Sequence, residues 1–253
     1  IIPQVLQVVE SKRTGNEINY EFPKKCPVCD WDVNRPEGEA VTRCTNPVCP
    51  AKIKGRLSYF AARKAMDIEG LGDVLIETLV DKGIVKDVAD LYALNIETLT
   101  RFERMGEKSA TKVIEQIENS KNRGLQRLLF GLDIRHVGDG YAKRIARQFH
   151  TIENLKSATV EQLDDIPDIG LSVAESVFQW FRDEKNIELI ERLRNFGVKL
   201  EIEESSTAIL DENFVNKTFV LTGKLENFTR DEAAKIIEDR GGKVSSSVSK
   251  NTN

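Results

Sequence analysis

The sequence predicts a multi-domain, mainly α-helical protein with a small cysteine-rich module and a partial α/β domain. Three observations predict this fold class. All four cysteines lie between Cys26 and Cys49. A pattern of helix, hairpin and helix then recurs four times over residues 61–205. From residue 206 to residue 253 the pattern changes to a strand followed by a helix.

The bulk composition is that of a folded protein without membrane-spanning segments. Hydrophobic residues make up 40% of the chain and charged residues 31%, which is ordinary for a globular protein. No apolar run approaches the ~20 residues that a membrane crossing needs, and no targeting peptide is visible, so we expect a cytoplasmic protein. The net charge of -4 gives no general attraction to polyanions, so any such attraction must be local.

Residues 1–22 are expected to be the end of a preceding domain. The sequence does not begin with Met, and its first nine residues are rich in apolar side chains. The apolar residues are Ile1, Ile2, Val5, Leu6, Val8 and Val9, and their pattern predicts a β-strand or strand pair that begins before residue 1.

Residues 23–60 contain a candidate metal site. The cysteines form two close pairs, Cys26-x2-Cys29 and Cys44-x4-Cys49, separated by a loop. Two such pairs can surround one Zn²⁺ tetrahedrally. Two disulfides are the alternative, but without a secretory signal, and in a chain of this length, metal binding is favoured. No His-x-Glu or Cys-x-Glu sequence suggests an activated water, so we expect a closed, structural zinc site.

Basic residues gather in two stretches. Residues 50–66 contain five basic residues and no acidic one, and residues 121–148 contain seven basic residues against two acidic ones. The acidic residues gather elsewhere, notably over residues 201–212. A single charge run is more often a solvated surface than a binding patch, but the segregation between modules favours local binding of a polyanion.

The repeat is defined by a glycine and the helix that follows it. The final glycines of the four units are Gly72, Gly106, Gly138 and Gly170. After each one, the positions at +3, +4, +7 and +8 form one face of an α-helix. With the exception of Ser109 these positions are apolar: Leu75, Ile76, Leu79, Val80; Ala110, Val113, Ile114; Tyr141, Ala142, Ile145, Ala146; Val173, Ala174, Val177, Phe178.

Such a hairpin is suited to binding the DNA backbone. Glycine at the start of a helix lets a partner approach closely, and the free N–H groups and positive dipole end of the helix favour a phosphate. Such contacts recognise the backbone and not the bases. The candidate DNA-binding residues are Lys52, Lys54, Arg56, Gly70, Gly72, Gly106, Lys108, Ser109, Gly138, Lys143, Arg144 and Gly170.

Two features weaken this interpretation for individual hairpins. Acidic Asp73 and Asp168 lie at the first and fourth turns. In three units the first glycine of the motif is replaced, by Arg104, His136 or Asp168, which argues against close phosphate contact there. For one unit alone, the glycines could simply permit the hairpin to pack. Four units in one register favour DNA binding, because paired hairpins can grip both strands.

Residues 206–253 read as the first half of an α/β domain. Lys217–Gly223 has the pattern of a buried strand. Thr229 and Glu232 form a capping box at the start of a helix, which Gly241 and Gly242 end, and a second strand is expected from Lys243.

The order of these parts resembles the C-terminal part of a bacterial NAD-dependent DNA ligase. By this resemblance, residues 1–22 are the end of an OB-fold domain, residues 23–60 a four-cysteine zinc finger, residues 61–205 a helix-hairpin-helix domain and residues 206–253 the start of a BRCT domain. The motifs that carry it are Ile2-Pro3-Gln4-Val5, Cys26-Pro27-Val28-Cys29, Cys44 to Ala51, Met66 to Gly72, Gly106 to Ala110 and Phe219 to Gly223.

The resemblance implies an enzyme that seals nicks in duplex DNA during replication and repair. In that family NAD adenylates a lysine of a Lys-x-Asp-Gly motif, which this sequence lacks. We therefore expect no catalytic and no NAD-binding residue here, an inactive chain when alone, and a catalytic lysine upstream. NAD and Mg²⁺ are implied for the full-length enzyme only. The expected partners are nicked double-stranded DNA and the adenylation domain of the same protein, in a monomer without membrane contact.

Two other interpretations remain open from the sequence. One is a non-catalytic repair scaffold that senses DNA structure through its zinc and hairpin modules. The other is a protein-interaction module that works through its C-terminal domain, with the hairpins as a plain helical support.

Overall fold

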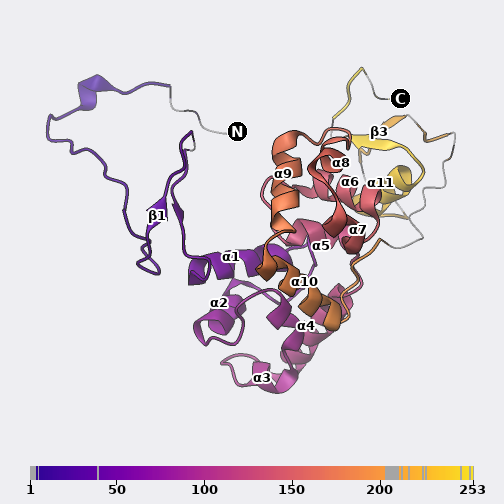
Figure 1. The fold of residues 1–253 in the computed structure, drawn as a ribbon, viewed down its shortest axis with the longest axis horizontal. Helices are drawn as coiled ribbons and strands as arrows, with labels where there is room; N and C mark the ends of the chain where they lie inside the picture. The colour runs from indigo at the N-terminus through magenta and orange to yellow at the C-terminus, as the bar shows by residue number, and fades with distance from the viewer. Residues whose placement is uncertain are drawn as a thin grey trace. The chain divides into compact units, whose positions relative to one another are not determined.

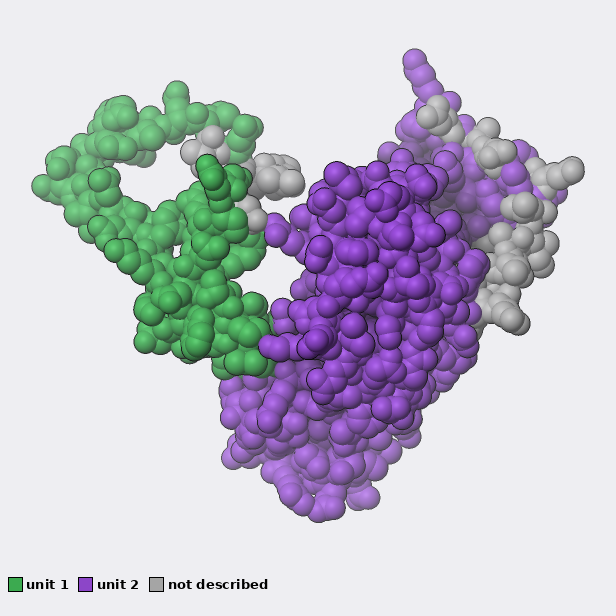
Figure 2. All heavy atoms as spheres, viewed as in Figure 1, with its two compact units in different colours: residues 1–55 green, residues 56–253 purple. Residues whose placement is uncertain are grey.

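The computed structural model describes residues 4, 6–38, 40–202, 211, 213–215, 217–223, 225, 227–245, 247–250 and 252. The chain divides into two compact units, Ile1–Gly55 and Arg56–Asn253 (Figure 2). Within the described ranges, none of the helices combines the length and the apolar composition that a membrane crossing requires.

The first unit is built around a small β hairpin. Strand β1 (Val33–Asn34) pairs antiparallel with β2 (Arg43–Cys44), and Val33 lies opposite Cys44. Among the described residues of this unit, the only buried side chains are those of Cys26 and Cys49. The described part of the unit therefore has no hydrophobic core of its own.

The expected strand at the start of the chain lies largely outside the described residues. Residues 1–3 and 5 are not described, and residues 6–9 form no strand. Among the residues described before the first cysteine, the regular element is a short 3-10 helix, η1 (Glu10–Lys12).

Helix α1 (Pro50–Ala61) begins directly after the last cysteine. Proline is well tolerated in the first turn of a helix, because the N–H it lacks would have no helical partner there. The boundary between the two units falls within this helix, after Gly55. Its second half belongs to the core of the second unit and buries Leu57, Phe60 and Ala61.

The second unit contains the four predicted repeats, and Figure 1 labels their helices. In each repeat a first helix leads into a hairpin and a second helix follows the predicted glycine. Within the repeats, α3 packs against α4, α5 against α6 and α8 against α9. The elements are α2 (Asp73–Asp81), η2 (Ala89–Ala93), α3 (Ile96–Thr100), α4 (Glu107–Ser120), α5 (Leu125–Gly131), α6 (Asp139–Phe149), α7 (Ile152–Ser157), α8 (Val160–Asp164), α9 (Leu171–Trp180) and α10 (Glu184–Asn195).

The core of the second unit is the stripe that the repeat predicts. Leu75, Ile76 and Leu79 are buried on α2, and the equivalent positions of α4, α6 and α9 are mostly buried as well. These are Ala110, Val113, Ala142, Ile145, Ala146, Val173, Ala174 and Val177. Ser109, the predicted exception, is exposed.

The segment Lys199–Ile202 joins distant parts of the array through its backbone. The N–H of Lys199 donates to the carbonyl of Lys121 at 2.8 Å, and the carbonyl of Glu201 accepts from the N–H of Leu125 at 3.1 Å. The carbonyl of Leu200 accepts from the N–H of Ile152 at 2.9 Å, and the N–H of Ile202 donates to the carbonyl of His150 at 3.0 Å. One short segment thus connects the ends of helices from the second and third repeats.

The C-terminal residues form the expected β-α-β arrangement. Strands β3 (Thr218–Val220) and β4 (Lys243–Ser245) pair in parallel, and α11 (Arg230–Asp239) connects them. The capping box is present, because Thr229 Oγ1 accepts from the N–H of Glu232 and the Glu232 carboxylate accepts from the N–H of Thr229. The helix ends where Gly241 takes a φ of 88°.

A forked ion pair links α10 to Asp87, just before η2, and to Asp90 within η2. Arg192 Nη1 lies 2.5 Å from Asp87 Oδ2, and its Nη2 lies 2.6 Å from Asp90 Oδ1. The hydrogen bond to Asp87 is the largest cause of the raised pKa of Arg192. We expect Arg192→Ala to lower the free energy of unfolding by about 1 kcal/mol, because it removes two charge-assisted hydrogen bonds, while both carboxylates keep their backbone N–H donors. Urea unfolding followed by circular dichroism measures this loss.

Lys185→Ala on the same helix is the matched control. Lys185 is exposed, and its ammonium makes no hydrogen bond or ion pair among the described residues, so its removal should change the free energy of unfolding by less than about 0.5 kcal/mol. Equal losses in the two variants would show that the ion pair contributes nothing.

Candidate zinc centre and hairpin array

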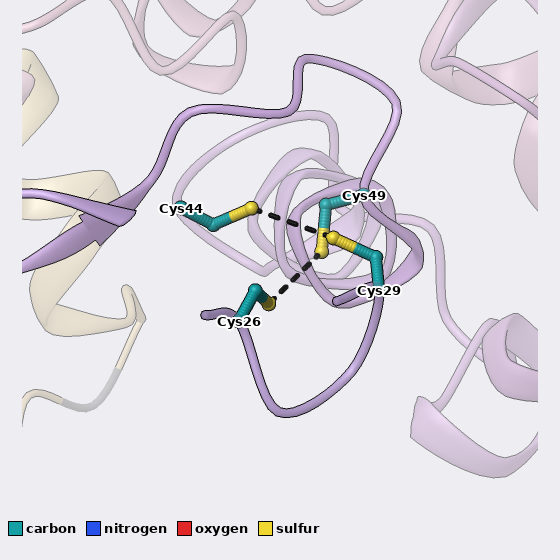
Figure 3. Close-up of side chains that lie close together, drawn as sticks. All are labelled: Cys26, Cys29, Cys44 and Cys49. Atoms are coloured by element: carbon teal, nitrogen blue, oxygen red, sulfur yellow. Dashed lines mark hydrogen bonds between the residues drawn. The ribbon is translucent and has the colours of Figure 1, made fainter. Parts of the chain in front are cut away.

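The four cysteine sulfurs converge on one point (Figure 3). Cys26 Sγ lies 3.9 Å from Cys49 Sγ, and Cys29 Sγ lies 3.5 Å from Cys44 Sγ. All four sulfurs lie within 4.8 Å of one another. A tetrahedral zinc with Zn–S bonds of about 2.3 Å separates its sulfurs by about 3.8 Å. A disulfide needs an S–S distance of about 2.05 Å, so the residues fit a metal and form no disulfide.

Turns on either side of the β1–β2 hairpin position the cysteine ligands. Cys26 opens a tight turn, in which its carbonyl accepts from the N–H of Asp30 at 2.9 Å and its N–H donates to the carbonyl of Trp31 at 2.7 Å. Cys49 precedes α1, and its carbonyl accepts from the N–H of Ile53 at 3.0 Å. Cys49 is thus fixed by the first turn of a helix, and Cys44 by the end of β2.

Asn46 explains the unusual length of the second cysteine pair. Its side-chain Oδ1 accepts from the N–H of Val48 at 3.0 Å, and its carbonyl accepts from the N–H of Cys49 at 3.4 Å. This local turn brings Cys49 back toward the other sulfurs despite four intervening residues. The sequence interpretation missed the role of Asn46, although asparagine between closely spaced ligands is a recognised turn signal.

The electrostatics of the thiols favour a cation. Burial, with a smaller effect from the neighbouring thiols of Cys29 and Cys26, raises the pKa of Cys44 to about 12. Burial acts in the same direction at Cys29, but hydrogen bonds from Trp31, Asn46 and the other thiols outweigh it and lower the pKa to about 6. Adjacent thiolates repel one another, so all four ionise together only around a positive ion. An all-sulfur, tetrahedral donor set is typical of structural zinc.

The four hairpin glycines share one geometry. Gly72, Gly106, Gly138 and Gly170 precede α2, α4, α6 and α9, with φ values of -83°, -76°, -82° and -98°. Any residue can adopt these angles. A Cβ placed on any of the four would meet no atom within 4 Å. Neither the backbone nor the internal packing therefore requires glycine there.

The same four helices begin without a side-chain cap. Other helices in this unit do have one: Asn95, Thr151, Thr159, Asp183 and Thr229 each accept a hydrogen bond from a backbone N–H in the first turn. A cap satisfies one of the free N–H groups at a helix start. The hairpin helices leave those groups available to a ligand.

The turn before each glycine also repeats. Gly70, Arg104, His136 and Asp168 hold equivalent positions, with φ values of 91°, 64°, 67° and 64°. Replacing the first glycine of the motif therefore leaves the turn unchanged. At Gly70 the interior of the protein limits the side chain, because a Cβ there would lie 3.0 Å from Cγ2 of Val113.

Several predicted basic contacts have intramolecular partners. Lys52 Nζ donates to the carbonyl of Cys44 at 3.4 Å, so it supports the metal site. Arg144 pairs with Asp168 at 2.8 Å, and Lys143 pairs with Glu238 of α11. Phosphate contact by these three side chains would have to compete with these interactions.

The remaining predicted contacts differ in exposure. Lys54 is half-buried, whereas Arg56 is exposed. Arg56 acts on the carboxylate of Asp133: burial raises the pKa of Asp133, and the positive charge of Arg56 offsets part of that increase. Lys108 and Ser109 are exposed in the first turn of α4. The structure thus brings the glycine positions into one repeated geometry, but it does not leave all the predicted cations equally available.

Comparison with known families assigns each of these parts. Residues 25–51 match the NAD-dependent DNA ligase C4 zinc finger domain. Residues 62–119 match the SAM-like helix-hairpin-helix tandem, and residues 127–190 match the helix-hairpin-helix motif. Residues 210–253 match the BRCA1 C-terminus (BRCT) domain. The predicted zinc finger, hairpin and BRCT regions are thereby confirmed.

Relatives named DNA ligase match the whole chain. The chain is 50% identical to that of Desulforamulus reducens over 253 residues, which are 100% of this chain and 38% of the relative. It is 46% identical to that of Thermoanaerobacter sp. and 47% identical to that of Heliobacterium modesticaldum, again over 100% of this chain and over 38% and 37% of those proteins. The chain thus spans little more than a third of the length of these relatives. With its ligase-type zinc finger, paired hairpin modules and BRCT region in one continuous match, it belongs to the NAD-dependent DNA ligase family.

Proposed function

We propose that this chain is the part of an NAD-dependent DNA ligase that holds nicked duplex DNA while the rest of the enzyme seals the nick. One observation carries the proposal. Four helices begin at a glycine that neither backbone angle nor internal packing requires, and no side chain caps them. Open backbone N–H groups at helix starts are suited to phosphate oxygens.

The chemistry of sealing belongs to residues outside this chain. Its sequence contains no Lys-x-Asp-Gly motif, so the lysine that NAD adenylates is expected elsewhere in the protein. NAD and Mg²⁺ would bind with that part. The hairpins would orient the duplex without reading its sequence, because backbone phosphates are the same at every site. In this proposal the full enzyme is a monomer and works in the cytoplasm.

Zinc would serve as the core of the first unit. The ligand cysteines Cys26 and Cys49 are the only buried side chains among the described residues of that unit. Without the metal, no apolar core in this described part would hold the turns and the β hairpin together. The zinc finger would then fix the start of α1, the helix that contains Lys54 and Arg56.

The same proposal divides the chain into the end of an OB-fold domain (1–22), a zinc finger (23–60), a helix-hairpin-helix domain (61–205) and the start of a BRCT domain (206–253). A repair scaffold without catalysis would also use zinc and hairpin modules, but the relatives that match the whole chain are named DNA ligase. The upstream sequence of the gene separates the two proposals, since a scaffold lacks the adenylated lysine.

The chain alone should not seal nicks, because it lacks the adenylated lysine. Adding the upstream part of the same protein should restore sealing that depends on NAD, as measured with a labelled nicked duplex on a denaturing gel. Sealing by the chain alone, or no sealing after the upstream part is added, would contradict the proposal.

Gly106→Val and Gly138→Val should each weaken binding to any duplex by roughly tenfold, because a side chain there blocks the approach of a phosphate to the helix start. Fluorescence anisotropy with duplexes of unrelated sequence measures the loss. The fold should persist, since both positions have open space around them and φ values that valine accepts.

Thr151→Val is the control, because it alters the start of α7, which follows no hairpin glycine. It should lower stability through loss of a cap and leave DNA affinity unchanged. A loss of affinity for only one base sequence in the glycine variants would argue against backbone recognition.

Cys26→Ser with Cys29→Ser should remove about one zinc per chain, since two of four ligands are lost. Elemental analysis by mass spectrometry measures the metal. Helicity from the second unit should remain, because that unit buries its own apolar core. A zinc content equal to that of the unaltered chain would refute the site.

A further inference from the structure

The four hairpins carry different residues at one turn position. Because the backbone conformation at this position is the same in all four, the side chains can be compared directly. Gly70, Arg104, His136 and Asp168 hold the same turn position, all with positive φ. Residues with a side chain adopt this conformation at a cost in free energy, whereas glycine does so freely. Each of the three larger residues can therefore be judged by what its side chain contacts.

Two of these side chains interact with the neighbouring repeat. The carboxylate of Asp168 pairs with Arg144 of α6 at 2.8 Å. The Nδ1 atom of His136 lies 3.2 Å from Oγ of Ser176 on α9. At these two turns the side chain joins the third and fourth repeats to each other.

Arg104 is different. It is exposed, and its guanidinium makes no hydrogen bond or ion pair within the described part of the chain. The same holds for the ammonium of Lys108, which lies in the first turn of α4 and is also exposed. Two cations without internal partners among the described residues therefore flank one uncapped helix start.

The other hairpins, as far as the structure describes them, lack such a pair. At the third hairpin, Lys143 and Arg144 pair with Glu238 and Asp168. At the first, Asp73 accepts a hydrogen bond from Ser58 at 2.9 Å, and glycine stands where the second hairpin has Arg104. The fourth turn contributes the carboxylate of Asp168 itself.

We propose that Arg104, with Lys108, makes the principal phosphate contact of the array, on a DNA phosphodiester at the start of α4. This inference rests on the proposed function, and it selects the second hairpin as the strongest of the four. A guanidinium donates two parallel N–H bonds to phosphate oxygens, and the ammonium of Lys108 adds a second charge. The carboxylates of Glu103 and Glu107 lie nearby in the sequence and oppose the anion, so they limit the affinity.

Arg104→Gly is the decisive substitution, because stability and binding should respond differently. Glycine suits the positive φ and already occupies this position in the first hairpin, so the melting temperature should stay the same or rise by up to roughly 3 °C. Affinity for a fluorescein-labelled nicked duplex should fall roughly tenfold. The slope of log affinity against log salt should become shallower by about 0.9, the value for one phosphate contact.

Three further variants separate charge from backbone conformation. Arg104→Asn tolerates the same φ without a charge and should lose as much affinity as Arg104→Gly. Arg104→Lys keeps a charge and should recover part of the affinity. Asp168→Gly makes the equivalent change in the fourth turn and should not weaken binding.

The outcomes distinguish this inference from the proposed function. If Arg104→Gly binds as well as the unaltered chain while Gly106→Val binds weakly, the hairpins hold DNA but Arg104 does not. Equal losses in Asp168→Gly and Arg104→Gly would also overturn the inference. If the unaltered chain shows no salt-dependent binding of the duplex, the proposed function fails, and this inference fails with it.

Discussion

Every helix in the hairpin array is too short to be stable alone, and this constraint determines the rest of the structure. The helices that follow the glycines have between 9 and 14 residues. Isolated helices of that length are marginal in water. Each one must bury its apolar stripe against another helix, so neighbouring helices of the repeats must pack together. The helix starts, which carry no stripe residue, are left free at the surface.

The two units meet this requirement for stability in different ways. The second buries a continuous set of aliphatic side chains, from Leu57 on α1 to Leu193 on α10. The first buries only cysteine among its described residues, so metal coordination replaces hydrophobic contact there. One helix, α1, belongs to both arrangements. The metal and the apolar core therefore act on opposite halves of the same element.

Local patterns made much of the fold predictable from the sequence. The cysteine spacing, the four glycines, the buried stripe and the capping box at Thr229 each depend on residues close together in the chain, and each is present. The charge pairs were not predictable in the same way. Arg192 pairs with Asp87, which lies 105 positions away in the sequence, and Arg144, a predicted phosphate contact, pairs with Asp168. Such pairs depend on how distant elements pack, and no local pattern encodes that. The role of Asn46 was not predicted because the cysteine spacing indicates the ligands without indicating which intervening residue forms the turn.

The segment Lys199–Ile202 has a consequence for how the array assembles. Its backbone bonds reach the carbonyl of Lys121 and the N–H groups of Leu125 and Ile152, which lie far back in the sequence. Closing such long loops is slow, and the segment has nothing to bond until those helix ends are in place. The repeats can therefore fold from local contacts, and this segment closes last. A local opening of this segment would break its four backbone hydrogen bonds to Lys121, Leu125, His150 and Ile152, while the helices on either side stay folded.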